Sequence, residues 1–283
     1  AGDLDMTNYA LPPEQFAKLQ KELPGEVFTT RTLATYSYEL NNKKAPFDNV
    51  NVRKALNLSL DRNVITDKVL GQGQTPTYVF TPTYIEEGHL IQQPAYSKEP
   101  MAQRNEEAIK LLEEAGYSKA NPLKFSILYN TNENHKKVAI AAASMWKANT
   151  KGLIDVKLEN QEWKTYIDSR RAGRYDAARA GWNADYNQAT TFGNYFLSNS
   201  SNNTAKYANP EYDKAIAESY VATDAEGRAK AYAKAEEILA KDFGIVPIFN
   251  YVNPRLVKPY VKGYSGKDPQ DHIYLRNLYI IKH

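Results

Sequence analysis

The densest group of potential ligand-binding side chains is the stretch Arg-Ala-Gly-Trp-Asn-Ala-Asp-Tyr-Asn at positions 179–187. Arg179 can bind a carboxylate and Asp185 an ammonium group, because hydrogen bonds between charged groups are strong and directional. The stretch starts as a strand and ends in a turn, and the glycine at 181 allows another backbone to approach closely. Such an edge could accept an extended peptide by main-chain pairing. The structural alternative places Trp182 in the core and joins Arg179 to Asp185 in an internal ion pair.

Other chemistries find little support in the sequence. The histidines at 89, 135, 272 and 283 show no paired metal-ligand spacing, and neither a nucleophile elbow nor a phosphate loop is present. The absence of cysteine excludes disulfides, a thiol nucleophile and thiolate metal sites. We therefore expect no metal, no cofactor and no catalytic residue, and place His89, His272 and His283 at the surface. Carboxylate pairs are not excluded, so a peptide or glycan hydrolase stays open as an alternative.

The composition further narrows the class of protein. The chain has 283 residues, with 36 basic and 33 acidic side chains and a net charge of +3, too weak a balance for a dedicated nucleic-acid binder. No apolar run approaches the roughly 20 residues of a membrane helix. Tyrosine occurs 21 times against 9 phenylalanines, and such amphipathic rings suit a binding cleft or the margin of a core.

Strand and helix patterns alternate, which indicates an α/β fold. Residues 71–100 are rich in proline and should form a long ordered loop, and Asp61 is placed to cap a second helical segment within 51–70. We expect helices at 13–22, 51–70, 104–115, 135–149, 163–172, 213–223 and 227–242, and strands at 26–30, 36–40, 123–129, 154–158, 175–182, 245–251 and 278–281.

Several stretches together give the chain a family resemblance. Besides 179–187, they are 51–56 with 61–62, 128–131 with 135–137, 160–164, 197–201, 210–213, 255–259 and 279–283. Through them the sequence resembles the periplasmic oligopeptide-binding proteins of bacterial ABC importers, and also their murein-tripeptide-binding relatives. The resemblance spans the whole chain but only about the C-terminal half of the family's length. The start at Ala1, without an initiator Met or a signal peptide, is consistent with a processed chain or a fragment.

The resemblance implies a type II periplasmic-binding-protein lobe, α/β with a mixed sheet flanked by helices, plus part of the first lobe. Residues 1–33 would belong to the first lobe, 34–252 would form the second, ligand-binding lobe, and 253–283 would return to the first. The hinge strands would cross near Ala34 and Val252.

The resemblance also assigns roles to residues. Asp185 would bind the ligand's ammonium group, and the backbone of Gly181, Trp182 and Asn183 would pair with the peptide. Arg179 and His135 would meet its carboxylate, depending on peptide length, although His135 by itself is expected to be a solvated residue at a helix start. The residues lining side-chain pockets would be Glu39, Trp163, Arg170, Asn202 and Tyr251.

Two departures from the family pattern stand out. Some relatives carry a cysteine pair at what are here Ala34 and Asn183, and a lysine that can meet the carboxylate of longer peptides is replaced by Leu70. The second departure bears on the preferred peptide length.

The function implied is that of a periplasmic solute-binding component of an ABC importer, not an enzyme. It would bind short peptides in an extended form between two lobes and deliver them to a membrane permease. Its partners would be those peptides, the permease and the missing N-terminal half of the same protein, with no nucleic acid. A murein-tripeptide-specific binder, a hydrolase and a scaffold are the alternatives.

Overall fold

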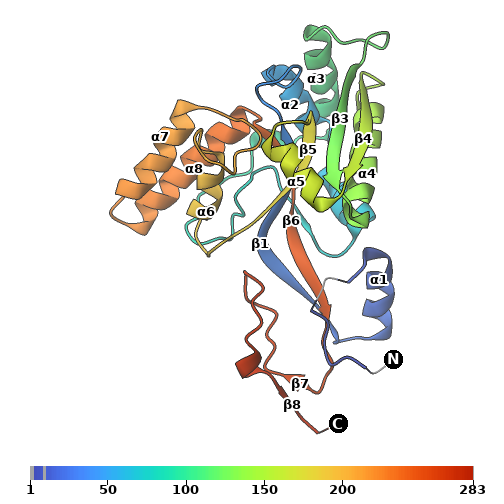
Figure 1. Ribbon diagram of the computed structural model, residues 1–283, viewed down its shortest axis with the longest axis vertical. Coiled ribbons are helices and arrows are strands. Elements are labelled where there is room, and N and C mark those ends of the chain that lie inside the picture. Colours follow the sequence, from blue (N-terminus) through green and yellow to red (C-terminus); the bar gives the residue numbers. More distant parts are fainter. Residues whose placement is uncertain (1–2, 9–10, 283) are drawn as a thin grey trace.

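The computed structural model describes residues 3–8 and 11–282; Ala1, Gly2, Tyr9, Ala10 and His283 lie outside this part of the chain. Figure 1 shows a large α/β body above and a smaller lower part that contains α1, β7 and β8. The long strands β1 (Val27–Leu40) and β6 (Ile245–Leu256) run from the body into the lower part. The two parts are therefore connected through an antiparallel pair of strands.

A six-stranded mixed sheet forms the centre of the body, in the order β2-β6-β1-β5-β3-β4. The neighbouring strands β2, β6, β1 and β5 pair in antiparallel fashion, whereas β5, β3 and β4 pair in parallel. The remaining strands of this sheet are β2 (Thr75–Pro76), β3 (Leu123–Asn130), β4 (Ile154–Gln161) and β5 (Ala177–Asn183). The expected mixed sheet flanked by helices is confirmed.

Helices cover the sheet and extend the body to one side (Figure 1). Polar caps begin several of them: Asn132 precedes α4, Asn209 precedes α7 and Asp224 precedes α8, each accepting backbone N–H groups. The helices are α1 (Pro13–Glu22), α2 (Val50–Leu58), α3 (Met101–Glu114), α4 (Glu133–Asn149), α5 (Trp163–Arg171), α6 (Thr190–Gly193), α7 (Pro210–Val221) and α8 (Ala225–Lys241). A π-helical segment spans Val64–Leu70, short 3₁₀ turns span Ala95–Lys98, Asn194–Phe196 and Leu275–Asn277, and the lower hairpin pairs β7 (Val261–Lys262) with β8 (Tyr279–Ile280).

Two large apolar clusters and a small one around Tyr166 stabilise the body. One large cluster surrounds the fully buried Trp146 of α4 and packs against the sheet; the other surrounds Phe192 and Phe196, beneath α7 and α8. Within the described part of the chain, no helix has the length and apolar character needed to span a membrane.

Two expectations about elements need correction. The strands expected at 26–30 and 36–40 are one strand, β1, because residues 31–35 stay extended although the pairing register with β6 shifts there. The helix expected over 51–70 is interrupted: Ser59 donates to the Ala55 carbonyl, α2 ends at Leu58, and a new segment follows. The Asp61 side chain accepts the backbone N–H groups of Asn63 and Val64, which confirms its expected role as a second cap.

Candidate functional site

The strand β5, which carries Arg179 and Gly181, has one free edge. On one side it pairs with β1 along its whole length, from Leu40 opposite Ala177 to Ala34 opposite Asn183. On the other side β3 pairs only with Ala177 and Ala178. Beyond them the Tyr166 hydroxyl donates to the Arg179 carbonyl, and no described strand lies beside residues 180–183. Main-chain groups at this edge are therefore available to another extended chain.

An open hollow of about 570 Å³ lies beside this edge, between the body and the C-terminal segment. It collects five of the predicted site residues, namely Trp163, Arg179, Gly181, Asn183 and Tyr251. The other lining residues are Thr32, Leu33, Ala34, Ala184, Val252, Asn253, Pro269, Gln270 and Asp271. Its size is within the range of small-ligand sites.

Arg179 is partly buried and lies among tyrosines. One of its Nη atoms donates to the Tyr251 hydroxyl at 2.5 Å, and its guanidinium carbon is 5.2 Å from the centre of the Tyr36 ring. A Cβ atom at position 181 would come within 2.8 Å of the Arg179 Nη2 atom and 3.1 Å of the Tyr251 hydroxyl. Glycine at 181 therefore makes room for this pair of side chains on the site face of the strand.

Asp185 and Trp182 have separate environments. Asp185 is exposed just beyond the end of β5, and its carboxylate accepts the Thr191 hydroxyl at 3.3 Å. The Trp182 indole N–H donates to the Thr191 carbonyl at 3.0 Å, and its ring packs against the second apolar cluster. The structural alternative is thus half right: Trp182 packs partly into the core, but no ion pair joins Arg179 to Asp185 in the described residues.

Glu39 and Arg170 form a buried ion pair. Glu39 is fully buried, and its carboxylate accepts the Arg170 guanidinium at 2.8 Å, the Tyr195 hydroxyl at 2.6 Å and the Thr204 hydroxyl. Both side chains are occupied by partners within the lobe and do not line the hollow beside β5.

His135 and Asn202 also lie outside that hollow. His135 packs 5.5 Å from the Tyr36 ring, and its Nδ1 atom is buried without a hydrogen-bond partner among the described atoms. Burial, together with the nearby charge of Arg179, lowers the pKa of His135 to about 3. The residue-based expectation of a solvated His135 is therefore wrong. Asn202 is exposed on a loop, where its backbone N–H donates to Ser200.

The structure also places the other residues that the sequence singled out. Ala34 and Asn183, where some relatives carry cysteines, are direct partners in the β1–β5 ladder. Leu70 is only 5% exposed, in the first apolar cluster and away from the hollow. Trp163, in contrast, is 54% exposed, with its ring 5.8 Å from that of Tyr166.

Several residues of the site were not among the predicted ones. Tyr36 contacts both Arg179 and His135, and its place in an alternating strand could have indicated an inward-facing ring. Gln270 and Asp271 reach the hollow from the C-terminal segment, which no local pattern connects with β5. Asp271 is held by Arg255 through contacts of 2.5 and 2.6 Å.

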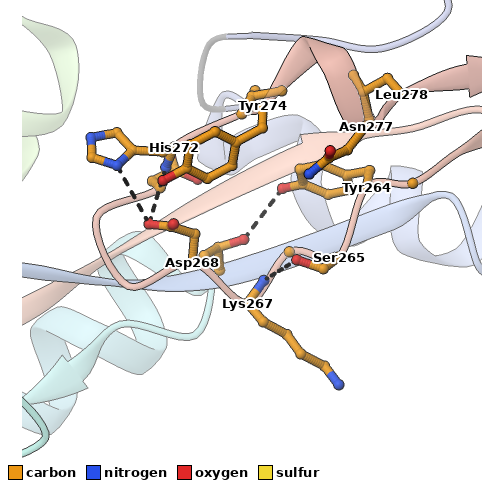
Figure 2. A pocket seen from close by; sticks show the side chains of 13 residues that line it. Tyr264, Ser265, Lys267, Asp268, His272, Tyr274, Asn277 and Leu278 are labelled. Atoms are coloured by element: carbon orange, nitrogen blue, oxygen red, sulfur yellow. Dashed lines mark hydrogen bonds and ion pairs between the residues drawn. The ribbon is translucent and has the colours of Figure 1, made fainter.

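Two other hollows contain none of the predicted binding residues. One, of about 300 Å³, lies in the lower part, where Figure 2 shows the Asp268 carboxylate facing His272 and Lys267 beside Ser265. The other is a groove of about 910 Å³ between α2, α3 and α8. His89 and His272 are exposed, as expected. Among the described residues, no group of three His, Asp or Glu side chains could hold a metal ion.

Comparisons with known proteins identify the family. The model for bacterial extracellular solute-binding proteins, family 5 Middle, matches residues 1–204. The chain belongs to this family. The family 5 chain is 96% identical over its whole length to the periplasmic oligopeptide-binding protein OppA of Haemophilus influenzae, of which it covers 52%. The family 5 chain thus spans about half the length of the curated relatives it matches.

Solved structures give the same assignment. The crystal structure of Haemophilus influenzae OppA in complex with RPPGFSPFR matches with a TM-score of 0.93 at 95% identity, over 99% of this chain and 55% of that one. The Escherichia coli murein tripeptide binding protein MppA matches with a TM-score of 0.90 at 43% identity, over 100% and 55%. The expected type II binding-protein fold is confirmed. The names of these relatives describe binding proteins.

Proposed function

We propose that this family 5 chain belongs to a periplasmic solute-binding component of an ABC importer, which binds short peptides in an extended form and delivers them to a membrane permease. The free edge of β5 at residues 180–183, beside an open hollow, carries this proposal. Main-chain pairing along such an edge binds peptides of many sequences, because the hydrogen bonds do not involve the side chains.

The chain would supply one complete lobe and part of the other. In this proposal residues 1–33 and 253–283 belong to the first lobe, residues 34–252 form the second, and the strands crossing near Ala34 and Val252 are the hinge. The long β1–β6 pair that joins the two parts in Figure 1 supports this division. The rest of the first lobe would come from an N-terminal half such as the relatives have.

Charged groups at the two ends of the free edge would fix the peptide's direction. Asp185, exposed just beyond β5, is suited to bind the ammonium group. Arg179 would bind the carboxylate of short peptides, and the neutral His135 behind it would assist for some lengths. A bound peptide would pair with the backbone of Gly181, Trp182 and Asn183.

Side-chain pockets would form around the edge. Trp163 and Tyr251 already line the hollow, which supports such a role for both. Glu39 and Arg170 would contribute as a fixed, neutralised pair, and Asn202 as an exposed loop residue. Wide pockets that retain water would allow the side chains of the peptide to vary.

An oligopeptide ligand is favoured over the murein tripeptide. The chain is 96% identical to an oligopeptide-binding relative but 44% identical to the murein peptide-binding protein of Escherichia coli. Competition between a murein tripeptide and a mixture of ordinary tripeptides distinguishes the two, and we expect the mixture to bind.

The test uses a full-length chimera, in which residues 1–283 replace the matching segment of the Haemophilus influenzae relative. Binding of RPPGFSPFR and of a tripeptide is measured by titration calorimetry. We expect Asp185→Asn to weaken binding of free-amine peptides by about 2–5 kcal/mol, because the ammonium group loses its buried partner in the closed cleft. N-acetylation of the peptide should have a similar effect.

Asp168→Asn is the matched control, because Asp168 is an exposed aspartate of α5 away from the hollow. It should bind like the unmodified chimera. Equal affinity for acetylated and free peptides, or unchanged binding by Asp185→Asn, would contradict the assignment of Asp185.

A further inference from the structure

Arg179 differs from three other arginines of the chain in the way its charge is held. Arg170 pairs with Glu39, Arg228 with Glu87 and Arg255 with Asp271, at 2.8, 2.6 and 2.5 Å. Arg179 forms no ion pair with any described carboxylate, and its Nε atom is buried without a hydrogen-bond partner there. Its surroundings are tyrosines instead. Because no carboxylate neutralises it, an arginine in such a position can bind an additional anionic group.

Tyr36 is the ring beneath this guanidinium. It lies in β1, is 1% exposed, and is stacked on Phe249 with the ring centres 4.7 Å apart. The rings of His135 and Tyr251 lie 5.5 and 5.9 Å from it. Tyr36 is thus fixed by packing on several sides and contacts three side chains to which the site assigns a role.

The contact between Tyr36 and Arg179 is made by the ring, not by the hydroxyl. The guanidinium carbon is 5.2 Å from the ring centre, within cation–π range. The Tyr36 hydroxyl is buried and has no hydrogen-bond partner among the described atoms. An aromatic face attracts a cation without neutralising it, whereas a carboxylate at the same place would cancel its charge.

We propose that Tyr36 is a positioning residue, whose ring holds Arg179 toward the free edge of β5 and leaves its charge for an anionic group of the ligand. Resting on the proposed function, this inference identifies that group as the C-terminal carboxylate of a short peptide. Tyr251 completes the arrangement, because its hydroxyl accepts a hydrogen bond from Arg179 without adding negative charge.

The side chains beside Arg179 add no second positive charge. His135 is neutral near pH 7, because burial and the charge of Arg179 lower the pKa of its imidazole to about 3. Around Arg179 the site therefore presents one cation beside the neutral side chains of His135, Tyr36 and Tyr251, an arrangement that favours a single carboxylate.

The inference is tested by the preference for peptide acids over peptide amides. The full-length chimera is titrated with a tripeptide and a tetrapeptide, each as the free acid and as the C-terminal amide. The dissociation constant of the amide divided by that of the acid reports how well Arg179 recognises the carboxylate. Tyr36→Phe, which keeps the ring, should retain the ratio, whereas Tyr36→Leu should reduce it about tenfold.

Tyr212→Leu is the matched control. Tyr212 is a buried tyrosine of α7 in the second apolar cluster, with its ring 5.7 Å from that of Tyr207. A loss of stability common to both leucine variants should weaken the binding of acids and amides alike and leave the ratio unchanged in Tyr212→Leu. A folded Tyr36→Leu protein with an unchanged ratio would overturn the inference.

Fluorination provides a test that does not change the packing. Replacing Tyr36 by phenylalanine and then by increasingly fluorinated phenylalanines weakens the negative face of the ring at nearly constant shape. The preference for acids over amides should fall with each added fluorine, and a flat series would contradict the role of Tyr36. If the unmodified chimera binds no peptide, the proposed function fails; if it prefers acids but no Tyr36 variant changes the preference, only this inference fails.

Discussion

Arg170 and Arg179 lie nine positions apart in the sequence, and their surroundings differ in one decisive respect. Each guanidinium is near a tyrosine ring, at 5.6 Å from Tyr166 and 5.2 Å from Tyr36. Arg170, however, also contacts Glu39, Tyr195 and Thr204, whereas Arg179 contacts no carboxylate in the described chain. Two arginines that each lie near a tyrosine ring can therefore serve opposite purposes: one is neutralised inside the lobe, and the other is left to bind.

The difference follows from where each side chain starts. Arg170 lies on α5 and points to the buried Glu39 of β1, where an unpaired charge would be costly. Arg179 lies at the point where β3 stops pairing with β5, beside the open hollow. The second site is open to solvent, whereas in the first the Glu39 side chain is fully buried and that of Arg170 is only 10% exposed.

Removal of Arg170 should give the largest change in stability. Arg170→Met leaves the fully buried Glu39 without its cation, which costs about 3–5 kcal/mol of unfolding free energy. Arg179→Met should cost less than about 1 kcal/mol, because no buried carboxylate loses a partner. Urea denaturation of the two variants measures both values, and the double variant Glu39→Leu with Arg170→Met should recover part of the loss. Equal destabilisation by the two methionine variants would break the comparison.

Removal of Arg179 should instead change ligand binding. In the full-length chimera we expect Arg179→Met to weaken the binding of a short peptide acid by about 2 kcal/mol, roughly 30-fold, because the carboxylate loses its charged partner. The amide of the same peptide should bind nearly as before. Calorimetric titration of both forms decides the matter; equal losses for acid and amide would show that Arg179 does not recognise the carboxylate.

The pH dependence of stability should show that a second cation beside Arg179 is unfavourable. The pKa of His135 falls from 6.5 to about 3 on folding, because the ring is buried next to Tyr36 and faces Arg179. The unfolded chain therefore binds the proton more tightly. The stabilising contribution of the neutral ring is complete above pH 6.5 and is lost as the pH falls toward 3.

The measurement is the unfolding free energy between pH 7 and pH 4, for the unmodified chain and for His135→Asn. The variant should lose less stability over this range than the unmodified chain. Parallel curves would mean that His135 accepts a proton in the folded state as easily as in the unfolded one.

Local sequence patterns predicted much of the fold and part of the site. The alternating elements, the cap at Asp61 and the strand expected at 175–182 depend on neighbours in the sequence, so the residue pattern was sufficient. The single strand β1 was not predicted, because its middle residues pair with distant segments: Arg31 and Thr35 with β6, more than 200 positions away, and Ala34 with Asn183 of β5.

Contacts between distant segments account for the rest of the site. Whether Arg179 pairs with an acid or an aromatic ring depends on the strand opposite, since Tyr36 faces Gly181 across the ladder. The same reason applies to Glu39, whose complete burial depends on Arg170, Tyr195 and Thr204. Residue type indicated that these side chains could bind, but only the packing shows which charges are already satisfied.

A third arginine–tyrosine pair is exposed to solvent, and its removal should have the smallest effect on the free energy of unfolding. Arg31 is exposed and lies 4.1 Å above the ring of Tyr84, whose hydroxyl donates to the Thr32 carbonyl at 2.6 Å. Tyr84→Phe removes only this hydrogen bond and should cost about 1 kcal/mol of unfolding free energy, because a partly buried carbonyl loses its donor. Arg31→Met should cost about 0.5 kcal/mol, since water screens an exposed cation. A larger loss from Arg31→Met than from Tyr84→Phe, in urea denaturation, would mean that exposure does not set the strength of these pairs.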